Sequence, residues 1–335
     1  MKPIARAGLF ALAVASPLAA ASAEPTMMKY GTGGPPDISI NAKLITPWSQ
    51  DVTAASDGTL DIKVFTGPSL VNLGNSYDRV LNGVAEMAFG ILGPVSSQFP
   101  RTAVITLPFK ARTSDEASTA LWHLYEQGVL GDEFQKVKLL AVGVFARTSL
   151  HTRQPVKKLE DLAGIKLSVQ SRMLGETVAK LGGTPITMPV SDLYESLQRG
   201  TIDGAAIGWP ATSAYKVNEI VTNHVDVPLG GEVAFMMMNK QAYEKLTGKA
   251  KAAIDKLDGM PYTKRFAATI DSDVSWSLGI TRSKKQSIVT LDPKEEERWR
   301  KQLEPVTAQW VAATPDGAKV LHALDAELIK IRGGS

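Results

Sequence analysis

The segment EDLAGIKLSVQS, residues 160–171, contains the pattern that decides the fold. Ile165, Leu167 and Val169 alternate with other residues, as the inward-facing side chains of a half-buried β-strand do. The residues before them form a capped turn that leads into the strand. Ser168 places a hydroxyl in the middle of this strand, where packing alone does not require one. A hydroxyl at this position raises the question of what the strand presents.

Further strands and helices alternate along the chain. Residues 60–65 (LDIKVF) show the same alternation, whereas 138–146 (KLLAVGVFA) and 232–239 (EVAFMMMN) are nearly continuous apolar runs. Continuous runs are typical of strands that helices cover on both faces. Apolar residues recur at helical spacing within 77–87 and 190–197. This alternation of element types predicts an α/β architecture.

The N-terminus has the three parts of a secretory signal. Lys2 and Arg6 precede an apolar run over residues 7–20, which is followed by the small residues Ala21-Ser22-Ala23. The run is shorter than the roughly 20 residues that a membrane span requires. The sequence therefore predicts cleavage after Ala23 and a protein exported to the periplasm.

Composition narrows the classes of function. The expected mature chain has 312 residues, with 35 basic and 34 acidic side chains and a net charge of +1. A balance so close to neutral gives no electrostatic reason to expect nucleic acid or an anionic membrane as a partner. The absence of cysteine excludes disulfides, thiolate chemistry and cysteine-ligated metals. The length and the hydrophobic content of 44% are those of about two domains.

No catalytic, metal-binding or cofactor motif is present. The four histidines are scattered and form no HExxH pair, and the chain has no G-x-S-x-G nucleophile motif. The string GTGGPP, residues 31–36, starts like a dinucleotide fingerprint but has Pro36 where the third glycine should stand. We therefore expect no cofactor and no metal, and an enzyme is the weaker class.

Five segments carry a resemblance to a known family. They are IKVFTGPSLVNLG (62–74), ITLPF (105–109), KKLEDLAGIKLSV (157–169), LGGTPITMPVSDLYESLQRGTIDG (181–204) and MMMNKQAYEKL (236–246). In their order and spacing they resemble the extracytoplasmic solute-binding proteins of TRAP transporters, the DctP-like family. The similarity extends over about residues 27–325.

The resemblance implies a two-lobed α/β fold, the type II-like fold of periplasmic binding proteins, with crossing hinge strands and a long interdomain helix. The crossings are expected near Arg147, Glu232 and Asp271. The expected division is a signal peptide at 1–23, a first lobe at 24–146 and 232–271, a second lobe at 147–231 and 272–325, and a C-terminal tail at 326–335. The implied partners are a small-molecule ligand and the small and large membrane permease subunits, served by a monomeric receptor.

The resemblance also implies where a ligand carboxylate would bind. In the family, an arginine on the strand after the DLKG motif makes a two-pronged contact with the carboxylate, which the planar guanidinium fork fits well. This chain has Ser168 at that position. A second family arginine, at the end of the preceding strand, matches Arg147. Arg172, near the start of the next helix, is a further candidate for the same pocket.

The remaining expected lining residues are less polar than those of family members that bind sugar acids. Trp209 stands where the family has an asparagine, and it offers either a stacking surface or ordinary core packing. Gly33, Ile91 and Leu92 are expected to line the first lobe. A heavily hydroxylated ligand would leave polar groups unpaired at about 1–3 kcal/mol each, so we expect a less polar ligand.

We expect a periplasmic receptor that captures a small organic acid, aromatic or weakly polar. Because the strand arginine is missing, the ligand could instead be neutral or cationic, with Glu232 or Asp37 taking part. The sequence is also compatible with a receptor for an ATP-driven importer, with a sensory module, and with an exported enzyme that acts on a small metabolite.

Overall fold

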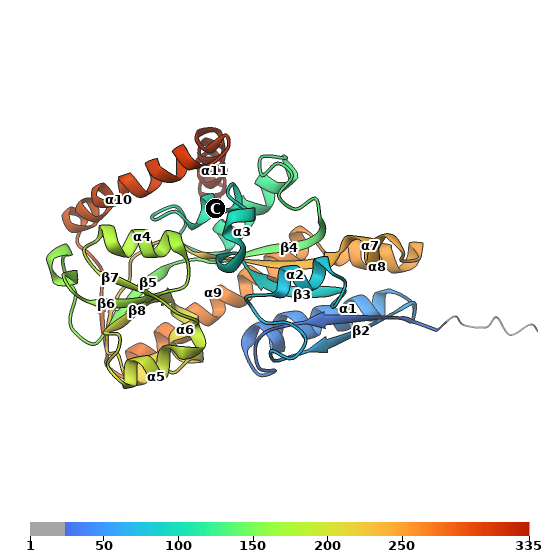
Figure 1. Cartoon of the computed structure of the whole chain (residues 1–335), viewed down its shortest axis with the longest axis horizontal. Coiled ribbons are helices and arrows are strands. Elements are labelled where there is room, and N and C mark those ends of the chain that lie inside the picture. The colour runs from blue at the N-terminus through green and yellow to red at the C-terminus, as the bar shows by residue number, and fades with distance from the viewer. Residues whose placement is uncertain (1–23, 335) are drawn as a thin grey trace, which may run out of the picture.

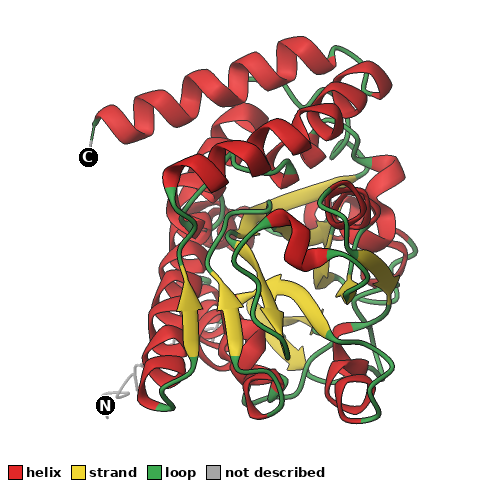
Figure 2. Ribbon diagram, turned by 90° about the vertical axis from the view of Figure 1, so that its left-hand side faces the viewer, coloured by secondary structure: helices red, strands yellow, loops and turns green. Residues whose placement is uncertain are grey.

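A computed structural model describes residues 24–334 as two β-sheets with helices around them (Figures 1 and 2). The predicted signal peptide lies outside the described residues. The first sheet has the order β2-β1-β3-β10-β4, in which β1 is parallel to β2 and β3 while β10 is antiparallel to β3 and β4. Its strands are β1 (Thr26–Gly31), β2 (Leu60–Phe65), β3 (Met87–Ile91), β4 (Val137–Phe145) and β10 (Glu232–Asn239).

The second sheet has the order β11-β9-β5-β8-β6-β7. In it β5 is antiparallel to β8 and β9, whereas β6 is parallel to β7 and β8. Its strands are β5 (Thr148–Thr152), β6 (Lys166–Val169), β7 (Thr184–Thr187), β8 (Gly204–Gly208), β9 (Asn223–Val225) and β11 (Ser287–Val289).

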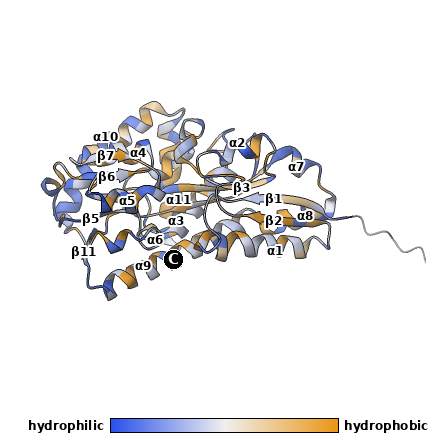
Figure 3. Cartoon of the chain, turned by 60° about the horizontal axis from the view of Figure 1, so that its bottom comes forward, coloured by the Kyte–Doolittle hydropathy of each residue, from blue (hydrophilic) through white to orange (hydrophobic). Residues whose placement is uncertain are grey.

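The α-helices lie mainly between consecutive strands or after them. They are α1 (Thr46–Ala55), α2 (Ser76–Leu81), α3 (Ser114–Glu126), α4 (Arg172–Lys180), α5 (Leu193–Gln198), α6 (Trp209–Ala214), α7 (Lys240–Glu244), α8 (Gly248–Leu257), α9 (Met260–Ser283), α10 (Pro293–Ala313) and α11 (Gly317–Gly333). Helices α1 and α9 carry both hydrophobic and hydrophilic residues, as amphipathic helices do (Figure 3).

The strands predicted from hydrophobic patterns are confirmed. The alternating segments become β2 and β6, and the two continuous apolar runs become β4 and β10. Six consecutive residues of β10 and of β4 are buried. Both strands belong to the first sheet, and helices cover them. This burial explains why polar residues do not alternate along them.

Two chain segments cross between the sheets. Ala146 and Arg147 join β4 of the first sheet to β5 of the second, and residues 226–231 lead back from β9 to β10. The two segments lie side by side, because Thr148 donates a backbone hydrogen bond to Gly230 at 3.0 Å. The predicted crossings near Arg147 and Glu232 are confirmed.

Helix α9 makes the third connection. It packs against α3 and β4 near the first sheet and against α6 and β11 near the second (Figure 1). Asp271 lies in its middle, as expected for the long interdomain helix. The α/β class is therefore confirmed, while the division of the chain into lobes by residue number stays a prediction.

The C-terminal residues differ from the expected tail. Helix α11 continues through Gly333, and Leu324 and Leu328 are buried against the apolar cluster that includes α3. Their spacing of four residues places them on one face of the helix, which packs on α3. Helix α10 also links the two lobes, because Trp299 packs in a cluster of the second sheet and Trp310 in one of the first.

Candidate ligand-binding site

Arg147 lies in the crossing between the two sheets. Its backbone has φ of 60°, in the left-handed region that residues other than glycine seldom adopt. The guanidinium donates a hydrogen bond from Nη2 to the carboxylate of Asp226, and the Arg147 side chain is 29% exposed. Across residues 24–334 this carboxylate is the only hydrogen-bond partner of the guanidinium, so its other N–H groups have no partner among those residues.

Asp226 was not among the residues expected in the site. It follows β9 at the start of the second crossing, and its backbone N–H donates to Val289 of β11. One carboxylate oxygen accepts from Arg147, and the other accepts from the indole Nε1 of Trp209 at 3.2 Å. The local sequence HVDVPLG does not distinguish Asp226 from a surface acid, because its partners come from other elements.

Trp209 begins α6 and is fully buried. Its ring packs against the rings of His151 and His224, with centroid distances of 4.9 and 5.3 Å. The ring also belongs to the apolar cluster that contains Tyr30 and Phe266 of the first lobe. These contacts are those of ordinary core packing, and a stacking role for Trp209 stays a prediction.

Ser168 is fully buried in β6. Its hydroxyl accepts a hydrogen bond from the side-chain amide of Gln170 at 3.1 Å. Gln170 was also missed. It follows β6 directly, and its spacing of two residues from Ser168 was the available signal. The position that holds an arginine in the family pattern is therefore occupied here by a serine with a neighbouring amide.

A small cavity of about 30 Å³ lies between the two lobes. Glu232, at the start of β10, contributes to its wall and accepts a hydrogen bond from the Gly93 N–H at 3.0 Å. Burial raises the pKa of the Glu232 carboxyl from 4.5 to about 7, against the opposing effect of the Gly93 hydrogen bond. The lining residues are Leu92, Gly93, Ser96, Ala103, Thr106 and Glu232 from the first lobe and Ser171, Arg172 and Met173 from the second.

The lobes approach closely at this cavity. A Cβ atom on Gly93 would lie 3.0 Å from the backbone oxygen of Gln170 and 3.3 Å from a Glu232 carboxylate oxygen. Met173 packs against apolar clusters of both lobes. A cavity of this size holds a water molecule but not a benzene ring, so the lobes must separate before a ligand of that size can enter.

The structure brings only some of the expected residues together. Leu92, Arg172 and Glu232 share the small cavity, while Arg147 and Trp209 meet through Asp226. The Arg172 side chain is 84% exposed and pairs with Glu176 at 2.8 Å, which is the geometry of a surface arginine. Whether these residues bind a ligand stays a prediction.

Gly33 and Ile91 lie in the first lobe outside that cavity lining. A Cβ atom on Gly33 would lie 3.0 Å from the backbone nitrogen of Leu73, so the chain passes too close for a side chain there. Ile91 is half-buried at the end of β3, beside the cluster that contains Trp209. Their predicted role in lining the site is untested.

No cluster of three or more histidine or acidic side chains within residues 24–334 could hold a metal ion. None of the helices in the same residues is long and apolar enough to cross a membrane.

Two sheets joined by crossing segments, with a cavity between them, define the class of two-lobed solute-binding proteins. The family model for bacterial extracellular solute-binding proteins, family 7 (DctP), matches residues 33–314. The chain belongs to this family, as its sequence motifs predict.

Known proteins agree with this assignment. A solute-binding protein of Chromohalobacter salexigens is 22% identical over 294 residues, which cover 82% of each chain. A TRAP solute-binding protein of Rhodoferax ferrireducens, solved with copurified benzoate, is similar with a TM-score of 0.85 and 24% identity over 91% of this chain and 98% of the other. A marine metagenome TRAP solute-binding protein specific for aromatic acids, solved with 3-hydroxybenzoate, has a TM-score of 0.87, the same identity and the same coverage.

These similarities confirm the predicted two-lobed binding-protein fold. As a member of the family, the protein is a bacterial extracellular solute-binding protein. The DctP family is one of receptors that bind solutes.

Proposed function

We propose that this receptor captures a small aromatic carboxylic acid between its lobes and delivers it to the TRAP permease. The arginine in the crossing carries the proposal. Arg147 is half-buried between the two sheets, and its guanidinium has N–H groups beyond the one that Asp226 occupies. A ligand carboxylate that accepts from those groups would hold the two lobes at their hinge.

The apolar side chains around the cavity support an aromatic body for the ligand. Leu92 and Met173 line the cavity from opposite lobes, and the Ser168 hydroxyl is already engaged by Gln170. Other polar side chains at the cavity are also engaged within the protein, since Thr106 donates to Ala103, Ser171 accepts from Leu174 and Glu232 accepts from Gly93. The hydroxyls of a sugar acid would compete for these groups, and each unpaired group would cost about 1–3 kcal/mol. Benzoate and 3-hydroxybenzoate, found in two structures of similar fold, are ligands of the expected size and polarity.

Calorimetric titration with benzoate, 3-hydroxybenzoate and glucuronate tests this proposal. We expect the two aromatic acids to bind and glucuronate to bind at least about tenfold more weakly. Arg147→Gln should weaken benzoate binding at least about tenfold, because a charge-assisted hydrogen bond is lost. The matched control is Arg199→Gln, since Arg199 is 73% exposed and pairs with Glu195 on the surface. Equal benzoate affinities for Arg147→Gln and the wild type would contradict the proposed anchor.

A second candidate is a neutral or cationic aromatic solute. The Arg147–Asp226 ion pair favours it, because the pair has no net charge, and Glu232 adds a carboxyl group to the cavity wall. Benzylamine and benzyl alcohol are suitable probes in the same titrations. If either probe bound more tightly than benzoate, a neutral or cationic solute would replace the organic acid as the proposed ligand.

We further propose that the protein returns its ligand unchanged. The support for this is the family, which is one of solute-binding proteins. NMR spectra of benzoate after prolonged incubation with the protein would show new resonances if the protein were an enzyme acting on this compound.

A further inference from the structure

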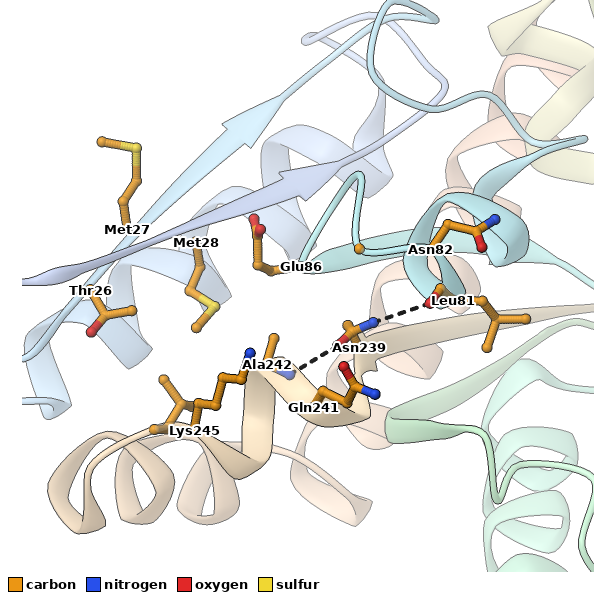
Figure 4. A pocket seen from close by; sticks show the side chains of 12 residues that line it. Thr26, Met27, Met28, Leu81, Asn82, Glu86, Asn239, Gln241, Ala242 and Lys245 are labelled. Atoms are coloured by element: carbon orange, nitrogen blue, oxygen red, sulfur yellow. Dashed lines mark hydrogen bonds between the residues drawn. The ribbon is translucent and has the colours of Figure 1, made fainter.

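A cavity of about 430 Å³ lies in the first lobe, where the beginning of β1 diverges from β3, beside Glu86, Asn239 and Lys245 (Figure 4). Glu86 already accepts from the Lys29 backbone, and the Asn239 amide caps α7 and donates to Val80. Glu86 and Asn239 are therefore used within the protein, and the remaining side chains around this cavity do not define a ligand class. The acid beside Arg147 carries a stronger inference.

Asp226 holds a fixed position against the Arg147 guanidinium. Its backbone is bound to β11 through Val289, and its second carboxylate oxygen accepts from the buried indole of Trp209. The crossing that contains Arg147 is held beside the crossing that contains Asp226 by the backbone bond from Thr148 to Gly230. The ion pair is therefore built into the hinge and is only 18% exposed at Asp226.

The pair changes the charge that a ligand meets. A guanidinium alone presents one positive charge, whereas the Arg147–Asp226 pair presents none. Asp271 on α9 adds a second carboxylate close enough to interact with Arg147, and it is held by the backbone N–H groups of Ser114 and Asp115. With Ser168 in place of the strand arginine, no second cation offsets these acids at that strand position.

We propose that Asp226 is a specificity-determining residue, whose carboxylate offsets the charge of Arg147 and limits the preference for a carboxylate ligand over an uncharged ligand of the same shape. This inference rests on the proposed function, because it requires a ligand that reaches the Arg147 guanidinium. It implies a receptor whose affinity comes mainly from the apolar body of the acid, while the hinge arginine supplies orientation.

Benzoate and benzamide are the probes, because they share a ring and a planar group but differ in charge. Asp226→Asn removes the negative charge and keeps an oxygen that can accept from Arg147. We expect the ratio of benzamide Kd to benzoate Kd to rise at least about tenfold in this variant, since an unpaired guanidinium attracts the anion more strongly. If the wild type binds benzoate too weakly to measure, Asp226→Asn should bring it into the measurable range.

Two further variants separate charge from packing. Asp226→Glu restores the negative charge, so its ratio should return to within about threefold of the wild type. Asp57→Asn removes the same charge from an exposed ion pair with Lys249 and should leave the ratio unchanged. A structural defect alone would weaken benzoate and benzamide together.

The outcomes distinguish this inference from the proposed function. If Arg147→Gln abolishes benzoate binding while Asp226→Asn leaves the ratio unchanged or lowers it, the anchor stands and the role of Asp226 is refuted. If Arg147→Gln has no effect on benzoate binding, the proposed function itself fails. If neither benzoate nor benzamide binds to the wild type or to Asp226→Asn, both the proposed function and the role of Asp226 are refuted.

Discussion

His151 and His224 lie with their Nδ1 atoms 2.8 Å apart, although 73 residues separate them in the sequence. They face each other from β5 and β9, both fully buried, beside the ring of Trp209. Burial lowers the pKa of both imidazoles, and the neighbouring His224 adds to the effect on His151. The pair is therefore neutral in the folded protein over a pH range in which the unfolded chain binds protons.

The first prediction is a loss of stability in mild acid. Below the ordinary pKa of 6.5 the unfolded chain binds protons that the buried pair does not, so the free energy of unfolding should fall as pH decreases. Each imidazole contributes a slope of up to about 1.4 kcal/mol per pH unit. Urea unfolding between pH 7.5 and 5 measures this slope, and His224→Gln should reduce it. Identical slopes for the variant and the wild type would contradict the prediction.

Glu232 should affect stability in the opposite direction. Its pKa of about 7 in the folded protein exceeds the ordinary 4.5, so the unfolded chain loses this proton first as pH rises. Stability is therefore lost between pH 4.5 and about 7. Glu232→Gln removes this loss and should stabilise the protein by about 2–3 kcal/mol at pH 8, with a smaller effect at pH 4.5. If the variant changed the free energy of unfolding equally at both pH values, the pKa of the Glu232 carboxyl would not be raised in the folded protein.

The hydrogen bond between Ser168 and Gln170 should contribute measurably to folding. Ser168→Ala leaves the Gln170 amide without its acceptor and should lower the free energy of unfolding by about 1 kcal/mol. Denaturant unfolding of Ser168→Ala, Gln170→Ala and the double variant forms a thermodynamic cycle. A coupling energy near zero would mean that the two side chains act independently.

Gly33 and Gly279 should respond to alanine with opposite signs. At Gly33 the added Cβ would lie 3.0 Å from the Leu73 nitrogen and 3.1 Å from the Asn72 Cα, so the backbone must move at a cost of about 1–3 kcal/mol. At Gly279, on the exposed face of α9, no atom lies within 4 Å. Alanine there should stabilise the helix by about 1 kcal/mol. Thermal unfolding of both variants checks the two signs, and a stabilising Gly33→Ala would refute the close approach.

Several residues of the candidate site could be named from the sequence, but the contacts between them could not be predicted from it. The patterns placed Arg147 at a strand end and Ser168 within a strand, and the structure agrees with both positions. Nothing in the pattern showed that Arg147 would pair with an acid 79 residues away, or that Trp209 would be fully buried. The expected tail is part of helix α11, because the apolar side chains on one face of this helix pack on α3, which lies far away in the sequence.

The sequence alone determined the α/β class, four of the strands and the family, because hydrophobic periodicity and local motifs are properties of neighbouring residues. The tertiary structure decided which charged side chains and which imidazoles come into contact. Those pairs depend on two crossing segments that lie side by side and on the register of β5 against β9, and both follow from the packing of the whole chain. The net charge beside Arg147 is therefore set by the fold, since it depends on Asp226 being carried to the hinge by a different strand.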